Sequence, residues 1–90
     1  MQTRIKDLKQ DYLENIWLAT LGNGIIYKTK DTVFQTGVKD GLLSNLINHI
    51  YVENDSSIWI ATNKGLNNLI YSFDQEKLVQ RKIISFTIND

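Results

Sequence analysis

The residues of this chain that could do chemistry are few, and the first of them is a single histidine, His49. With one histidine and no cysteine, one chain cannot build a two-histidine metal site, a thiolate nucleophile or a cysteine-based zinc or iron–sulfur centre. His49 could line a channel on an innermost strand and sense a ligand or the pH, whereas a polar side chain at a strand edge is the simpler interpretation. We keep His49 as a candidate ligand contact, and expect no metal and no cofactor.

Three carboxylates, Asp11, Glu53 and Asp55, precede the two tryptophans of the chain. They could suggest calcium, but their spacing lacks the dense alternation of oxygen ligands found in calcium loops. Glycosidase chemistry would need two carboxylates across a cleft, one with a raised pKa, and the sequence places no pair in this way. Aspartate is common in turns because its side chain bonds to nearby backbone N–H groups. We therefore expect turn structure at these positions and no enzymatic activity.

The two tryptophans, Trp17 and Trp59, could stack on a sugar ring. Each lies inside an apolar run and the two repeat in register, which is typical of packing residues. Thr20 and Thr62 follow at equivalent places and are expected to bond to neighbouring backbone rather than to act as nucleophiles. The aromatic residues are therefore predicted to be structural.

Charge and hydropathy exclude further classes of partner. Ten basic residues balance ten acidic ones, and Lys28-Thr29-Lys30 and Arg81-Lys82 are too short to form a basic stripe, so nucleic acid is not expected as a partner. Apolar runs of about four residues fall far short of the roughly twenty that a membrane-spanning helix needs. The first ten residues also lack a signal-peptide core. We expect a soluble segment without membrane contact.

The elements that must position these residues form a repeat. Ile16-Trp17-Leu18-Ala19-Thr20 recurs forty-two residues later as Ile58-Trp59-Ile60-Ala61-Thr62, and each copy leads into a glycine followed by an aliphatic residue, Gly24-Ile25 and Gly65-Leu66. A period in the low forties with one tryptophan per unit is typical of stacked four-stranded sheets. The fold class is therefore predicted as all-β, with two stacked four-stranded antiparallel sheets, in residues 1–40 and 41–90.

Each unit is predicted to hold four short strands bounded by turn residues. The expected strands are 4–9, 15–20, 25–28 and 32–36 in the first unit, and 46–52, 57–62, 66–71 and 83–88 in the second. An alternative is a helix near the start, because Ile5, Leu8 and Tyr12 have helical spacing. The β-branched and aromatic residues of 47–52 count against it, since equivalent units should share a structure. A helix over 74–82 is a second alternative, and we favour an extended hairpin or loop there.

The segment 37–45 is predicted to link the units, with turns at Asp40-Gly41 and Ser44-Asn45 and with Leu42 between the sheets. The chain ends in a stretch like the approach to Asp40, so we expect that it was cut at a unit boundary. Asn23-Gly24 and Lys64-Gly65 are predicted to form tight hairpins through the positive φ of glycine.

This pattern resembles the two-component regulator propeller repeat, found in sensor ectodomains of hybrid histidine kinases of the Bacteroidetes type. The residues that carry the resemblance are Asp40-Gly41-Leu42-Leu43-Ser44-Asn45, Ile47, Ile50, the run Asp55 to Thr62, and Gly65-Leu66-Asn67. The first unit repeats the signature from Asp11 to Ile25. The chain departs from the family where Ala19 and Ala61 replace a usual glycine and where Glu14 and Ser56 replace a common turn glycine.

The resemblance implies that the two units, 1–40 and 41–90, are four-stranded antiparallel β-propeller blades. It also implies a non-enzymatic, periplasmic sensor segment that detects a small carbohydrate-like molecule and signals to a kinase. Candidate ligand contacts are the non-repeating polar groups on turns and on the interblade linker, Asn23, Lys39 and Lys64, together with His49 from the inner strand. Asp7 aligns with His49, so the two units present different chemistry at that place. The alternatives are blades of a propeller polysaccharide lyase or hydrolase, and a self-assembling scaffold without ligand.

Two blades alone cannot close a ring. Repeat units generally need about three or more copies for stability, and large exposed apolar faces mark association sites. The expected partners are therefore other propeller blades, from the same parent chain or from copies that assemble into a ring with an even number of blades.

Overall fold

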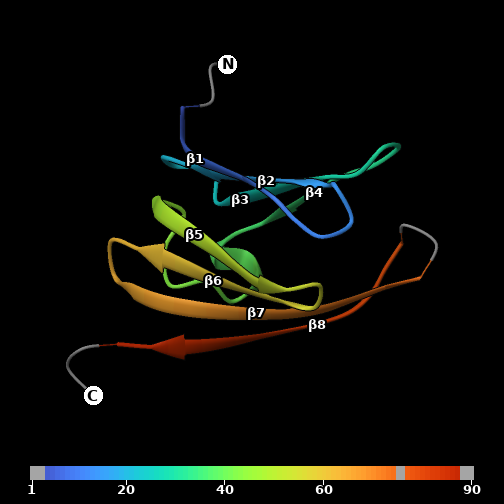
Figure 1. The fold of residues 1–90 in the computed structure, drawn as a ribbon. Coiled ribbons are helices and arrows are strands. Elements are labelled where there is room, and N and C mark those ends of the chain that lie inside the picture. The colour runs from blue at the N-terminus through green and yellow to red at the C-terminus, as the bar shows by residue number, and fades with distance from the viewer. Residues whose placement is uncertain (1–3, 75–76, 88–90) are drawn as a thin grey trace.

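The chain folds into two antiparallel four-stranded sheets whose strands follow one another in chain order (Figure 1). The computed structural model describes residues 4–74 and 77–87. For residues 73, 74 and 77–80 it describes only the backbone. The first sheet holds β1 (Ile5–Gln10), β2 (Ile16–Thr20), β3 (Ile25–Lys28) and β4 (Val33–Thr36). The second holds β5 (Ile47–Asn54), β6 (Ser57–Thr62), β7 (Gly65–Asp74) and β8 (Lys77–Phe86). The predicted fold class is confirmed.

The predicted strand near the start is confirmed and the alternative of a helix there is wrong, because β1 pairs with β2 from Ile5 to Gln10. The longest difference from the predicted strands lies in the last hairpin. There β7 runs on to Asp74 and β8 begins at Lys77, well before the predicted start at Ile83. At Asp74 and over 77–82 the chain forms an extended hairpin rather than the helical alternative, since Asp74 pairs with Lys77 and Ile70 with Lys82. Residues 75 and 76 lie outside the described residues. The predicted strand end at residue 88 lies outside the described residues.

The two sheets stack face to face, and the core lies between them (Figure 1). Side chains opposite one another in neighbouring strands share a face, because side chains alternate along a strand. The row Trp17, Tyr27 and Phe34 therefore belongs to the face of the first sheet that meets the second. Ile50 and Ile60 form the matching row of the second sheet, and both are fully buried.

The segment between the sheets is a connector formed by residues 37–46, with a short 3₁₀ turn η1 (Val38–Asp40). Asp40 accepts the backbone N–H of Gly37 over 2.9 Å and the guanidinium of Arg81 over 2.7 Å. The Gly37 N–H and the Arg81 charge hold the pKa of Asp40 below its ordinary value, although partial burial opposes this shift. Leu42 is 3% exposed, so the prediction that it packs between the sheets is confirmed.

The end of the connector is joined to the first sheet by its backbone. The carbonyl of Asn45 accepts the N–H groups of Gly22 and Gly24, and the Asn45 Oδ1 accepts the N–H of Val38. In the other direction, the N–H of Leu43 donates to Oδ1 of Asn67 in the second sheet. The connector therefore forms hydrogen bonds with both sheets, in addition to joining them along the chain.

The hairpin glycines behave as predicted. Gly24 and Gly65 have positive φ angles of 76° and 144°, which favour glycine. A Cβ on Gly65 would lie 2.6 Å from the carbonyl oxygen of Phe86, and one on Gly24 would meet the carbonyl oxygen of Thr36. The end of the fourth strand of each sheet thus lies too close to the turn for a side chain at either glycine position.

Candidate functional site

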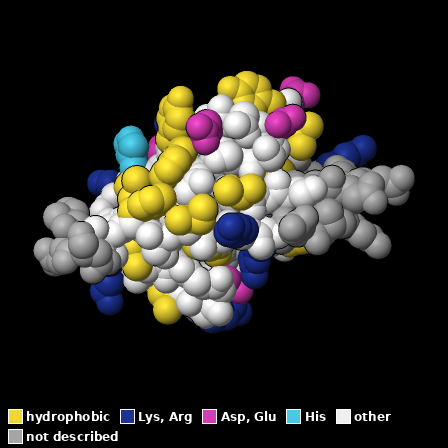
Figure 2. All heavy atoms as spheres, turned by 90° about the horizontal axis from the view of Figure 1, so that it is seen from below, with side chains coloured by type: hydrophobic (Ala, Val, Ile, Leu, Met, Phe, Trp, Pro, Cys, Tyr) yellow, Lys and Arg dark blue, Asp and Glu magenta, His cyan; other side chains and the backbone are white. Residues whose placement is uncertain are grey.

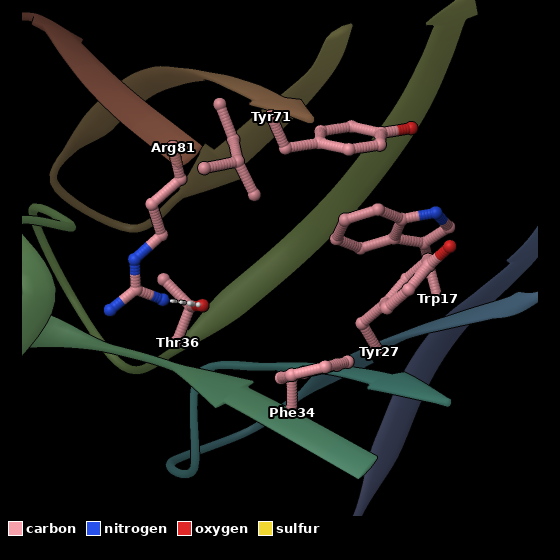
Figure 3. Close-up of a pocket in the computed structure, with 7 residues that line it drawn as sticks. Trp17, Tyr27, Phe34, Thr36, Tyr71 and Arg81 are labelled. Carbon is pink, nitrogen blue, oxygen red and sulfur yellow. Dashed lines mark hydrogen bonds between the residues drawn. The ribbon is translucent and has the colours of Figure 1, made fainter. Parts of the chain in front are cut away.

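The contact between the sheets has an aromatic centre (Figure 3). The indole of Trp17 lies 4.0 Å from the ring of Tyr27 and 5.1 Å from that of Tyr71, measured between centroids. The cavity beside these rings is about 10 Å³, which is at the lower limit for a single water molecule. Figure 3 also shows Arg81 reaching across to Thr36, with 2.8 Å between Nη1 and Oγ1. This region is a packed interface and leaves no room for a ligand.

Asp11 anchors the aromatic centre from the turn between β1 and β2. Its Oδ1 accepts the N–H groups of Leu13 and Asn15, and its Oδ2 accepts the Trp17 indole N–H and the Tyr27 hydroxyl, all within 3.1 Å. A buried carboxylate needs such partners, and Asp11 is 7% exposed. The predicted turn role of Asp11 is confirmed. Burial and the nearby Asp11 carboxylate also raise the pKa of Tyr71, which stays protonated.

Asp7 links the inner strands of the two sheets. Its Oδ2 accepts the backbone N–H of Ile50 in β5 over 3.1 Å, and its Oδ1 accepts the N–H of Leu8. Burial opposes ionisation of Asp7, but these two bonds and the charges of Lys9 and His49 outweigh it and lower its pKa. The His49 Nδ1 lies 3.8 Å from Oδ2 of Asp7, and the His49 side chain is 74% exposed. His49 is therefore an exposed strand residue beside the join between β1 and β5.

A polar hollow lies at the end of the sheets where the connector meets the β2–β3 turn. Its volume is about 250 Å³, and it is lined by Gly22, Asn23, Gln35, Gly37, Val38, Lys39 and Asn45. The Nε2 of Gln35 donates to the carbonyl oxygen of Asn23 over 2.7 Å, which ties β4 to the turn. The hollow brings together two of the four predicted ligand contacts, Asn23 and Lys39.

Lys64 lines a different hollow, an open groove of about 750 Å³ on the second sheet. The groove lies over the β6–β7 turn and is walled by Leu66 and Phe86. The equivalent turn of the first sheet, between β2 and β3, is contacted by the connector, because the Asn45 carbonyl accepts the N–H groups of Gly22 and Gly24. The structure therefore places Lys64 and His49 apart from the pair Asn23 and Lys39.

Two residues of the polar hollow, Gln35 and Asn45, were missed by the sequence argument. Gln35 alternates outward on β4, and Asn45 belongs to the repeat motif, so neither differs from an ordinary surface or turn residue. The register Ile26 to Gln35 across β3 and β4 is the signal that could have placed Gln35 near the turn.

Each sheet has one face that no other part of the described structure covers. Figure 2 shows that hydrophobic side chains gather on the face of the second sheet. The exposed apolar residues of this face are Tyr51, Leu66, Ile70 and Phe86, with Trp59 partly buried beside Phe86 at a centroid distance of 5.8 Å. On the open face of the first sheet the exposed apolar residues are Ile5, Leu8 and Val33. Both ends of the two-sheet stack are therefore apolar.

Within residues 4–74 and 77–87, no three acidic, histidine or cysteine side chains are grouped so that they could hold a metal ion. Among the same residues, no helix has the length and hydropathy to cross a bilayer.

The comparisons with known proteins agree with the sequence pattern. Residues 41–64 match the family model described as "Two component regulator propeller", which confirms the resemblance over the second part of the connector, β5, β6 and the following turn. No curated protein and no solved structure matches the chain. Together with the two four-stranded sheets, the match supports a propeller segment of a two-component regulator.

Proposed function

We propose that this chain is part of a non-enzymatic sensor propeller that binds a small carbohydrate-like molecule at the connector end of its sheets. The observation that supports the proposal is the polar hollow lined by Asn23, Gln35, Lys39 and Asn45. The family resemblance supports the further proposal that this sensor belongs to a hybrid kinase and lies in the periplasm.

The chemistry of the lining suits sugar hydroxyl groups. A hydroxyl both donates and accepts, and the amide side chains of Asn and Gln do the same. The Asn45 Oδ1 is held by the N–H of Val38, which orients the amino group of that side chain. Lys39 adds a flexible cationic donor. At about 250 Å³ the hollow is slightly below the range of drug-sized sites, so it fits one sugar residue rather than a long chain.

The position of the hollow also suits a switch. Asn23 and Gln35 belong to the first sheet, whereas Lys39 and Asn45 belong to the connector that bonds to the second sheet through Leu43 and Asn67. A ligand that touches both parts makes contacts that depend on how the sheets are packed. It can therefore favour one packing over another and pass that preference to the adjoining parts of the protein.

The test is calorimetric titration of the chain with a panel of mono- and oligosaccharides, using Lys39→Ala and Gln35→Ala as test variants. Each substitution removes one polar group from the hollow and should weaken binding by about tenfold, equivalent to about 1.4 kcal/mol. Lys64→Ala is the matched control because it removes the same ammonium group from the separate groove. If no sugar binds, or if Lys64→Ala weakens binding as much as Lys39→Ala does, the proposed site is wrong.

A further inference from the structure

We infer that the open face of the second sheet docks onto the open face of the first sheet of a second copy of this chain. The second copy would supply the next blade, head to tail, in the register that joins the two sheets within one chain. This inference depends on the packing of the sheets and not on the proposed ligand.

The interface within the chain provides the template. The sequence repeat aligns β2 with β6 through Trp17 and Trp59, and the registers within each sheet then align β3 with β7. Residues on the covered face of the first sheet therefore have counterparts on the open face of the second. Trp17, Ala19 and Ile25 are buried beneath the second sheet, with exposures of 2%, 0% and 1%. Their counterparts on the open face are Trp59, Ala61 and Leu66. The open face of the second sheet therefore carries residues like those that the second sheet covers on the first.

The opposite faces match in the same way. The face of the second sheet that is buried in the chain carries Ile47, Ile50, Ile58 and Ile60, all at most 1% exposed. The counterparts on the open face of the first sheet are Ile5, Leu8, Ile16 and Leu18, from the registers of β1 with β2 and of β5 with β6. Ile5 and Leu8 are 52% and 54% exposed, so this apolar row has no cover in a single chain.

At one contact the residues of the open faces differ from those of the covered interface, and the two differences match each other. In the covered interface Leu69 lines the aromatic centre beside Tyr27. The counterpart of Leu69 is Lys28, since Ile16 pairs with Lys28 as Ile58 pairs with Leu69. The counterpart of Tyr27 is Asn68, since Trp17 pairs with Tyr27 as Trp59 pairs with Asn68. An apolar contact inside the chain is therefore replaced by a polar pair between copies.

The charges of the two open faces are complementary at this place. Lys28 is exposed on the open face of the first sheet. On the open face of the second, the Glu53 Oε1 accepts the indole N–H of Trp59 over 3.1 Å and the hydroxyl of Ser57 over 2.8 Å. In the template register Lys28 of the second copy comes beside Trp59, and its ammonium lies within reach of the Glu53 carboxylate. This ion pair distinguishes docking of a second copy from indiscriminate contact between apolar surfaces.

The test is the mass of the full chain in solution, measured by sedimentation equilibrium over a range of concentrations. The parent chain should associate into multiples of its 10.4 kDa mass. Lys28→Glu and Glu53→Lys should each weaken association by about tenfold or more, because each places like charges opposite one another. The double variant restores an opposite pair at every contact and should recover most of the lost association.

Lys39→Glu is the matched control because it makes the same charge change on the connector, away from both open faces. Circular dichroism and tryptophan fluorescence check that each variant is folded. A parent chain that stays monomeric overturns the inference. So does a double variant that associates no better than the single variants, since the contact would then not join residues 28 and 53.

Discussion

The indole N–H of Trp17 donates a hydrogen bond to the Oδ2 of Asp11 over 3.1 Å, across the turn that joins β1 and β2. The second unit repeats this bond between Trp59 and Glu53, also over 3.1 Å. The first pair is buried, whereas Glu53 is exposed. This bond between indole and carboxylate is thus the same in both units, and what differs is whether a neighbouring sheet covers it.

This difference predicts unequal costs for removing the two tryptophans. Trp17→Ala should lower the free energy of unfolding by about 3–5 kcal/mol, as for other buried aromatic residues. Trp59→Ala should cost less in a monomer, because Trp59 lies on the open face of the second sheet and is only partly buried. Urea unfolding at low protein concentration measures both, with Trp17→Phe as a milder variant if Trp17→Ala does not fold. Equal losses would mean that the second sheet does not cover Trp17.

The carboxylates should behave in parallel. Asp11→Asn keeps the shape of the side chain but replaces one accepting oxygen with a donor, facing either two backbone N–H groups or the Trp17 and Tyr27 donors. We expect a loss of about 2–3 kcal/mol of unfolding free energy, since buried groups lose their partners. Glu53→Gln is the matched control, with an expected loss under about 1 kcal/mol. The comparison uses the same urea unfolding curves, and a larger effect at Glu53 would contradict it.

Glu14 offers a stabilising substitution. Among the described residues other than glycine it is the one with a positive φ, 64°, a backbone conformation that favours glycine. An L-residue pays about 1–2 kcal/mol in this conformation, and glycine loses about 0.5–1 kcal/mol through chain entropy. Glu14→Gly should therefore raise the unfolding free energy by about 0.5–1 kcal/mol. Thermal and urea unfolding give the measurement.

Ser56→Gly is the control for Glu14→Gly, because Ser56 occupies the equivalent turn position without a positive φ. It should leave the stability unchanged or lower it. A gain at Ser56 as large as that at Glu14 would mean that relief of the left-handed backbone is not the cause.

The join between the inner strands should be sensitive to acid. Because the folded chain lowers the pKa of Asp7, the ionised carboxylate contributes stability above the ordinary aspartate pKa of about 3.9. This contribution is lost as the pH falls below that value through the folded pKa. Asp7→Asn should therefore be less stable than the parent at pH 6, and the gap should narrow below about pH 4. Urea midpoints between pH 6 and pH 2.5 test this, and a gap that widens in acid would contradict it.

Much of the fold was open to prediction from the sequence because it rests on local patterns. The repeated tryptophan motif gave the two units, and the bounds 25–28 and 57–62 agree with β3 and β6. The last hairpin was predicted too short. Residues 74–82 are mostly charged or amide side chains, which occur in loops as well as in long hairpins, so residue types alone did not show that β7 and β8 extend there. Pairing between strands, rather than the preferences of single residues, determined that length.

The candidate site was open to prediction only in part. Asn23 and Lys39 were selected as polar residues on a turn and on the connector, and they line one hollow. His49 and Lys64 were selected by the same criterion and lie elsewhere. Sequence identifies polar, non-repeating positions, but nearness in space depends on how the connector folds back onto the β2–β3 turn.

The sequence by itself determined the two-unit repeat, the all-β class, the turn glycines and the packing character of the tryptophans, because each of these follows from residue types at short spacing. Only the tertiary structure decided which tryptophan is covered and which sheet faces stay open. Both units carry the same tryptophan motif, so the motif cannot tell them apart in this respect. The difference arises because the second sheet lies on the first, while the equivalent face of the second sheet still has room for a neighbour.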